Sequence, residues 1–153
     1  KKSASLIARK KELSDHVIPS SNSIMAHNLY RLGQIFSKEE FIEQSEKMLE
    51  QVIDKLDQGN IYYSNWSRLL FRKAYPTAEM VIMGPQSIRY SFEMQQAYMP
   101  NLTIVGSPDS SYLPLMENRL SAKATKIYVC KNSSCELPTE SIQTAKNILN
   151  NLN

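Results

Sequence analysis

The chain contains only two cysteines, Cys130 and Cys135, and their type and spacing suggest chemistry more directly than any other pair of residues. Cys130 ends an apolar run that begins at Lys126, and Cys135 lies in a polar stretch that Pro138 closes. Cysteines in such a pattern can bind a metal, exchange with a disulfide, or serve as packing and loop residues. The pattern therefore points to thiol chemistry without naming a reaction.

Each of these three interpretations requires something different from the rest of the chain. A structural metal site needs about four ligands, and the two histidines, His16 and His27, lie far away in the sequence. The redox interpretation stays open, although the spacing lacks the tight C-x-x-C placement that lowers a thiol pKa at a helix N-terminus. We expect Cys130 to be buried and Cys135 to be accessible, with no metal, no cofactor and no stable disulfide. The sequence does not exclude a disulfide, but one could form only if the two Cα atoms come within ~7 Å of each other.

A second polar group lies near the start of the chain, where Asp15 and His16 are adjacent in a loop that contains Pro19. An Asp–His pair can act as a general base, because the carboxylate orients the imidazole. A solvated loop histidine is the simpler alternative. Asp15 and His16 are therefore the candidate catalytic residues of the sequence.

The first half of the chain, to about residue 75, predicts helices. A short helical stretch is expected over residues 3–13. Apolar residues then recur at a helical period from Ile24 to Phe36 and from Phe41 to Leu56. A further helix is expected from about Asn65 to Lys73. Two long helices with a short joint predict an antiparallel hairpin.

Three helix starts have residues that can accept a hydrogen bond from a free backbone amide. Ser21 or Asn22 is expected to cap the helix that follows the Asp15 loop. Ser37 and Glu40 have the spacing of a capping box. Thr139 is expected to cap the last helix.

The second half of the chain predicts strands that alternate with helices. Strands are expected at 79–83, 102–105 and 126–130, and helices at about 86–99, about 109–120 and 139–150. This alternation predicts a small, mostly parallel three-stranded sheet with helical crossovers. The fold class is therefore mixed α and α/β, with a helical domain over 1–76 and an α/β subdomain over 77–153.

Composition limits the partners. The formal net charge is +3, but the excess of positive charge lies in the first thirteen positions, so no basic face for nucleic acid is expected. No apolar run approaches the ~20 residues that a bilayer requires, so no membrane partner is expected. The small number of cysteines favours a reducing compartment, which we take to be the cytoplasm.

Two motifs, and a third shorter one, resemble a known family. Residues 15–23 (DHVIPSSNS) are similar to the D-G-A-x-P-S-G-N-S loop of the spermatogenesis-associated, YyaL-like thioredoxin-domain proteins. Residues 128–138 (YVCKNSSCELP) resemble the Y-V-C-x-N-x-x-C-x-x-P ending of that family, and residues 98–101 (YMPN) its Y-x-P-N. The loop departs from the pattern at His16 and Ser21, which stand where the family has glycine.

The resemblance implies that this chain is the C-terminal fragment of a longer protein. A thioredoxin-like domain would come first, followed by an (α/α)₆ toroid related to six-hairpin glycosidases and N-acylglucosamine 2-epimerases. This chain would supply the last helical hairpins of the toroid and the α/β subdomain.

Two functions follow from this expected architecture. In the first, the toroid binds a carbohydrate-like ligand under thiol redox control, and the chain is not active alone. The residues at the toroid mouth would be Asp15, His16, Pro19, Ser20 and Asn22, with Cys130 and Cys135 as the redox pair. In the alternative, the chain is a non-catalytic scaffold for the thioredoxin domain. The expected partner is the rest of the parent chain, and the isolated fragment would expose apolar helix faces and could form a homo-oligomer.

Overall fold

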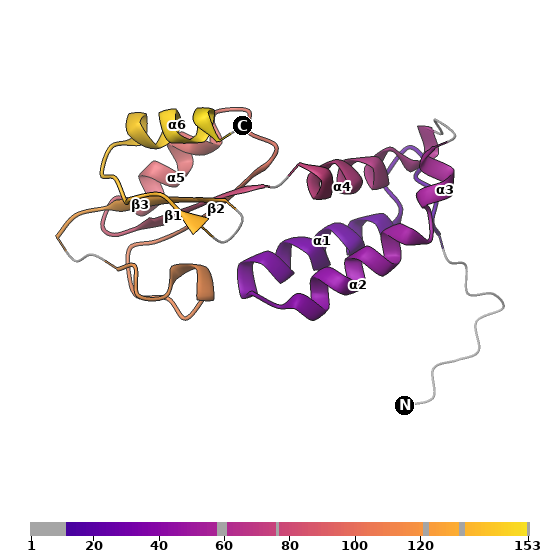
Figure 1. The fold of residues 1–153 in the computed structure, drawn as a ribbon, viewed down its shortest axis with the longest axis horizontal. Helices are drawn as coiled ribbons and strands as arrows, with labels where there is room; N and C mark the ends of the chain where they lie inside the picture. The colour runs from indigo at the N-terminus through magenta and orange to yellow at the C-terminus, as the bar shows by residue number, and fades with distance from the viewer. Residues whose placement is uncertain (1–11, 58–60, 76, 121–122, 132–133, 153) are drawn as a thin grey trace. The chain divides into compact units, whose positions relative to one another are not determined.

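A computed structural model describes residues 12–57, 61–75, 77–120, 123–131 and 134–152 (Figure 1). Most of the helical stretch predicted over 3–13 lies outside these residues. The chain divides into two compact units: a helical unit that contains residues up to 34 and 38–70, and a sheet unit that contains 35–37 and the residues from 71 onward. The boundary predicted between residues 76 and 77 stays a prediction.

The helices of the first half of the chain lie wholly or mostly in the helical unit. Its elements are α1 (Ser21–Phe36), α2 (Glu39–Glu50), α3 (Ile53–Leu56), a 3-10 turn at Ile61–Tyr63, and α4 (Ser64–Ala74). Figure 1 shows α1 and α2 as an antiparallel pair with a very short joint, as the sequence predicts.

One apolar core holds these helices together. Its buried members come from α1, α2, the joint before α3, the 3-10 turn and α4: Ala26, Tyr30, Leu49, Val52, Tyr63, Trp66 and Leu69. Two hydrogen bonds reinforce the packing. Trp66 Nε1 donates to the Leu13 carbonyl at 2.7 Å, and Ser45 Oγ donates from α2 to the Ala26 carbonyl of α1 at 2.8 Å.

Gly33 permits the close approach of α1 to the start of α2. A Cβ atom added at this position would lie 2.5 Å from Ile42 Cγ1 and 3.0 Å from the Lys38 carbonyl oxygen. Lys38 N donates to the Gly33 carbonyl at 2.9 Å, so the chain turns tightly at this joint. A side chain at residue 33 would push the two helices apart.

Two predicted features of α2 are wrong. The capping box is absent because Ser37 has a left-handed backbone (φ 52°) and the cap residue is Lys38, which makes no side-chain cap bond. The predicted helix from Phe41 to Leu56 is also interrupted, because Val52 leaves the helical region (φ −122°, ψ 0°) between α2 and α3. Val52 is fully buried, so the break turns an apolar side chain into the core.

The sheet unit contains four strands in the order β2-β1-β3-β4. Their bounds are β1 (Ala78–Met83), β2 (Leu102–Ser107), β3 (Lys126–Lys131) and β4 (Ser134–Cys135). The three predicted strands are confirmed, and they lie in one sheet. The mostly parallel arrangement is wrong, because only β1 and β2 are parallel, whereas β3 runs antiparallel to both β1 and β4.

The connections explain these directions. The helix α5 (Ser87–Gln95) links β1 to β2 as a crossover, which a parallel pair requires. The predicted helix over 109–120 is only a 3-10 turn, η2 (Pro114–Met116), so no second crossover forms before β3. The last helix, α6 (Ile142–Asn151), is capped by Ser141 instead of Thr139, since Ser141 Oγ accepts from Thr144 N at 3.2 Å.

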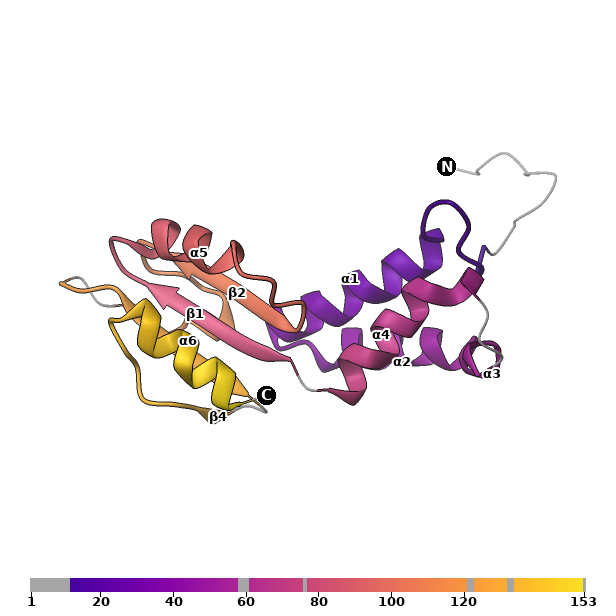
Figure 2. The same ribbon diagram turned by 90° about the horizontal axis from the view of Figure 1, so that it is seen from above.

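The two faces of the sheet are covered differently. Figures 1 and 2 show α5 and α6 on the same face, and the core beneath them includes Met80, Ile82, Met94, Ile127 and Val129. A smaller apolar cluster on the other face joins Val81, Met83 and Met116 under η2. Alternate residues of β1 and β3 therefore contribute to different layers.

Gly84 ends β1 with a backbone conformation that favours glycine (φ 124°). A Cβ atom there would lie 2.6 Å from the Ala124 carbonyl oxygen and 2.9 Å from Thr125 Cα, both backbone atoms. We predict that Gly84→Ala lowers the free energy of unfolding by roughly 1–3 kcal/mol, measured by urea denaturation. Gly106→Ala is the matched control, because its closest contact is the Ser91 hydroxyl, which can rotate away. Equal losses in the two variants would contradict this explanation.

Candidate functional site

Cys130 and Cys135 are joined by a disulfide, with a sulfur–sulfur distance of 2.11 Å and a Cα–Cα distance of 3.9 Å. The expectation of two unlinked cysteines is therefore wrong. The sequence suggests a polar loop after Cys130, but the chain folds back and Ser134–Cys135 forms the short strand β4. Antiparallel pairing then places Cys135 directly opposite Cys130.

The register of the strands favours this bond. Glu136 N donates to the Val129 carbonyl at 2.9 Å, so Cys130 and Cys135 form the adjacent pair that is not hydrogen-bonded. Side chains of such pairs approach each other more closely than those of hydrogen-bonded pairs. The two halves of the disulfide differ in environment: Cys130 is 2% exposed, whereas Cys135 is an exposed residue.

Arg119 places its guanidinium against both sulfur atoms. Its Nη1 lies 3.6 Å from Cys130 Sγ and its Nη2 lies 3.4 Å from Cys135 Sγ. The guanidinium carbon of Arg119 lies over the Tyr128 ring, 5.2 Å from the ring centroid. The Tyr128 hydroxyl donates to the Arg119 carbonyl at 3.4 Å. A cation in contact with a cysteine favours its thiolate form, so this arrangement can support thiol exchange.

Glu79 lies across from Cys130 on the neighbouring strand β1. Because β3 also pairs with β4, the residues Glu79, Cys130 and Cys135 form one row across three strands, on one face of the sheet. Burial raises the pKa of the Glu79 carboxyl, and the charge of Arg119 opposes part of that rise. We call Glu79, Arg119, Tyr128 and the two cysteines the disulfide centre.

Nothing in the sequence marks Arg119 or Glu79 as members of this centre. They lie 11 residues before and 51 residues before Cys130, on different elements. Only the strand register and the path of the segment after η2 bring them to the sulfurs. These residues could be identified from the sequence only if the antiparallel pairing of β3 with β1 were already known.

The loop around Asp15 is organised by its carboxylate, which is 3% exposed. Asp15 Oδ1 accepts from Ser20 N at 2.9 Å and from Ser23 Oγ at 2.8 Å, and Oδ2 accepts from Asn65 N at 2.9 Å. One side chain thus ties the loop to the starts of α1 and α4. These contacts engage both carboxylate oxygens in holding the fold.

The cap of α1 differs from the prediction, which named Ser21 or Asn22. Ser20 Oγ accepts from Ser23 N at 3.2 Å and donates to the Leu13 carbonyl at 3.2 Å. Asn22 instead donates through Nδ2 to the Glu12 carbonyl at 2.8 Å. The helix therefore begins one residue after the hydroxyl that caps it.

The remaining candidates of the loop are exposed. The His16 ring lies 3.5 Å from Ser14 Oγ and 5.8 Å from the Tyr62 ring, and Pro19 is on the surface. Within the described part of the chain, no hydrogen bond joins the His16 ring to the Asp15 carboxylate. The structure therefore groups Asp15 with Ser20, and the catalytic role of Asp15 and His16 stays a prediction.

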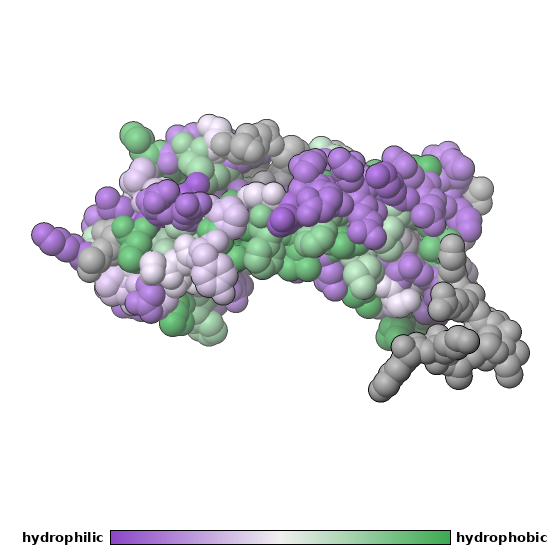
Figure 3. Space-filling view, turned by 90° about the horizontal axis from the view of Figure 1, so that it is seen from below, coloured by the Kyte–Doolittle hydropathy of each residue, from purple (hydrophilic) through white to green (hydrophobic). Residues whose placement is uncertain are grey.

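Exposed apolar side chains lie in this loop and in the 3-10 turn that is hydrogen-bonded to it. Four of them, with exposed fractions of 102%, 74%, 78% and 51%, are Val17, Ile18, Ile61 and Tyr62. Asp15 N bonds to the Tyr62 carbonyl, which brings the two segments that carry them together. Figure 3 shows hydrophobic residues, in green, among polar residues on the surface of the molecule. We call these four residues the apolar patch.

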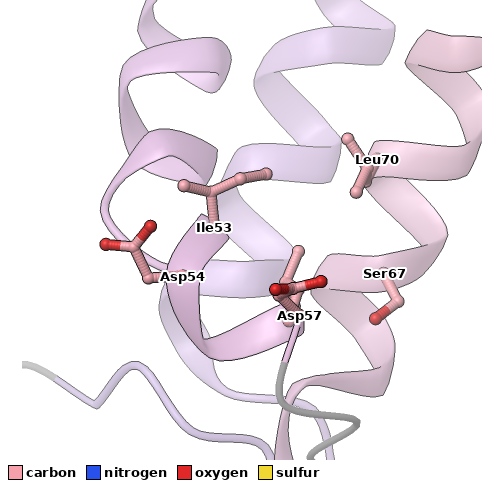
Figure 4. A pocket seen from close by; sticks show the side chains of 6 residues that line it. Ile53, Asp54, Asp57, Ser67 and Leu70 are labelled. Carbon is pink, nitrogen blue, oxygen red and sulfur yellow. The ribbon is translucent and has the colours of Figure 1, made fainter.

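The helical unit also has an open pocket of about 610 Å³ that the sequence did not suggest (Figure 4). It is lined by Ile53, Asp54, Leu56, Asp57, Ser67 and Leu70. The carboxylates of Asp54 and Asp57 point in different directions (Figure 4). Across the described ranges, no three His, Cys, Asp or Glu side chains are grouped as metal ligands. The pocket therefore offers no obvious chemistry.

The chain is similar to proteins from several animals. It is 27% identical to human spermatogenesis-associated protein 20 over 147 residues, which is 88% of this chain and 19% of that protein. It is 25% identical to the rat protein of the same name over 142 residues, covering 85% of this chain and 18% of the relative. An uncharacterised protein of Caenorhabditis elegans is 26% identical over 147 residues, which is 91% of this chain and 20% of that protein.

The family resemblance is confirmed. The chain spans about a fifth of the length of these curated relatives. No family model matches the chain, and no solved structure matches it. None of the helices within the described residues has both the length and the apolar character that crossing a bilayer requires.

We predict that Asp15→Asn lowers the free energy of unfolding by roughly 2–4 kcal/mol, because an amide NH₂ would replace an oxygen that accepts a buried hydrogen bond. Thermal and urea denaturation measure this loss. His16→Ala is the matched control, since His16 is exposed and its removal should change the free energy by less than about 0.5 kcal/mol. Comparable losses at both positions would contradict the structural role of Asp15.

We predict a pH-dependent stability difference between the native chain and Glu79→Gln. The raised pKa of Glu79 means that its stabilising contribution is complete below the ordinary value of 4.5 and is lost as the pH rises through the raised pKa. Glu79→Gln should therefore gain stability relative to the native chain over that window, measured by urea denaturation at a series of pH values. An exposed glutamate, changed in Glu140→Gln, serves as the control. A constant difference at all pH values would contradict the burial effect.

Proposed function

We propose that the sheet unit carries a reversible thiol–disulfide couple, Cys130 and Cys135, which exchanges with an external dithiol. The observation that carries this proposal is the contact of one guanidinium with both sulfurs of a disulfide whose Cys135 side is exposed. Exposed disulfides are in general the labile, regulatory or catalytic ones. A disulfide that served only to stabilise the fold would need neither the cation nor the exposure.

The reaction is an exchange in which two electrons move from the dithiol to the protein. A thiolate of the dithiol attacks one cysteine sulfur, the sulfur–sulfur bond breaks, and the other cysteine leaves as a thiolate. The second thiol of the reductant then attacks the reductant's other sulfur in the mixed disulfide and releases the remaining cysteine as a thiolate. The products are two cysteine thiols and one disulfide in the former dithiol.

The reductant that best suits the family is the dithiol of a thioredoxin domain. We infer that this domain lies in the remainder of the parent polypeptide, because the relatives are about five times longer than the matched segment. In the cytoplasm, where glutathione and thioredoxins keep thiols reduced, such a disulfide would be transient and would report the redox state. This gives the chain a regulatory role within the larger protein.

The apolar patch supports a second candidate function, that of an interaction module. Contiguous exposed apolar residues are typical of surfaces that another protein segment covers. We infer that further helices of the parent toroid would cover this surface, and that a homo-oligomer is the alternative for the isolated chain. A carbohydrate-like ligand at the Asp15 loop rests on the family resemblance alone.

We predict that the native chain is fully reduced by millimolar dithiothreitol without denaturant, because Cys135 is accessible. A glutathione titration should give a reduction potential above about −300 mV, the range below which structural disulfides lie. The free thiols are counted with a chromogenic thiol reagent in native buffer. Cys135→Ser, which cannot form the bond, serves as the control. A disulfide that opens only on unfolding would overturn the proposed couple.

A further inference from the structure

We propose that exchange at this disulfide has one direction: the incoming thiolate attacks Cys135, Cys130 leaves, and Arg119 is the catalytic residue that stabilises the leaving thiolate. This inference rests on the redox role proposed above and deepens it. It assigns different tasks to the two cysteines and adds a residue that no sequence pattern indicates.

Access favours Cys135. Cys130 is 2% exposed and lies on β3, between β1 and β4 in the sheet. Cys135 is exposed and lies on β4, which is the last strand at that margin of the sheet. A thiolate on a partner therefore reaches the Cys135 sulfur first.

The line of attack favours the same sulfur. Exchange proceeds by displacement, so the nucleophile must approach each sulfur from the side opposite its bonded partner. The disulfide joins neighbouring strands, so an approach to Cys135 comes from beyond β4, where the sheet ends. An approach to Cys130 comes from the side of β1, where Glu79 is its register partner. Glu79 and the strands beyond it therefore stand in the line of approach to Cys130.

The charge explains which thiolate can leave. When Cys130 leaves, its buried sulfur takes the electron pair of the broken bond, and a buried anion without a partner is costly. Arg119 Nη1, 3.6 Å from this sulfur, supplies the compensating charge. Stacking on Tyr128 holds the guanidinium there before the bond breaks, so little reorganisation is needed.

The remaining steps balance without a further reactant. The first attack leaves the reductant's sulfur bonded to Cys135 and a thiolate at Cys130, which takes a proton from water. The reductant's second thiol displaces Cys135 and becomes oxidised in doing so. With a monothiol such as glutathione, the first attack gives a mixed disulfide, and an early acid quench traps it before a second thiolate reacts, which makes the attacked sulfur visible.

The direct test uses the unmodified oxidised chain and glutathione, with an early acid quench and alkylation of free thiols in denaturant. Trypsin separates the two cysteines, because Lys126, Lys131 and Lys146 define the peptides 127–131 and 132–146. We expect glutathione on the peptide that contains Cys135 and the alkyl group on the peptide that contains Cys130. The excess over the reverse pattern should be at least about tenfold. An even or reversed distribution would overturn the direction.

The role of Arg119 is tested by the rate of reduction with dithiothreitol. Arg119→Gln should slow the reaction about tenfold, and Arg119→Lys should restore part of the rate, since it keeps a cation near the sulfurs. Lys123→Gln removes the same charge from an exposed position and should leave the rate unchanged. Circular dichroism confirms folding, and an unchanged rate in folded Arg119→Gln would remove the catalytic role.

The outcomes separate the two proposals. If the native disulfide does not react with either thiol, the redox couple itself fails. If it reacts but glutathione appears equally on both peptides, the couple stands and the directional mechanism fails. Because the peptide map needs no variant, a failure of Arg119→Gln to fold would still leave the direction decided.

Discussion

The antiparallel pairing of β3 with β1 is the constraint on which the disulfide centre depends. Strand side chains alternate between the two faces of a sheet, so the register Glu79–Cys130 decides which face carries the sulfurs. A slip of one residue would turn Cys130 into the core under α5 and α6 and would place Val129 opposite η2. The apolar residues of β1, which are buried on both faces, hold the register by packing against both layers.

The helical unit depends in a similar way on one buried carboxylate. Asp15 accepts hydrogen bonds from the backbone of Ser20 and Asn65 and from the hydroxyl of Ser23, so it joins a loop to two helices that are distant in the sequence. Such a residue looks catalytic in the sequence, because aspartate next to histidine in a polar loop is a familiar arrangement. Burial and three hydrogen bonds give its oxygens a structural task, and His16 beside it is exposed.

The parts of the structure that follow from local sequence were predictable. The apolar runs became strands, and the amphipathic stretches became α1, α2, α4, α5 and α6, because burial of a stripe or a run depends on nearby residues. The direction of β3 was not predictable, since it depends on whether residues 109–120 form a crossover helix, and two prolines and several serines in and before that segment prevent one. The pairing of Cys135, the contact of Arg119 and the position of Glu79 all follow from that direction, so they were missed together.

The small size of the ring that the disulfide closes has a thermodynamic consequence. The two cysteines are only five positions apart in the sequence. In a chain-entropy treatment, a link between residues so close together raises the free energy of unfolding by only about 2 kcal/mol. A longer ring would raise it more. The strands of the sheet unit are held by apolar layers on both faces, which do not involve this bond. We therefore expect the architecture of the sheet unit to persist whether the bond is closed or open, which is the property that the proposed reversible couple requires.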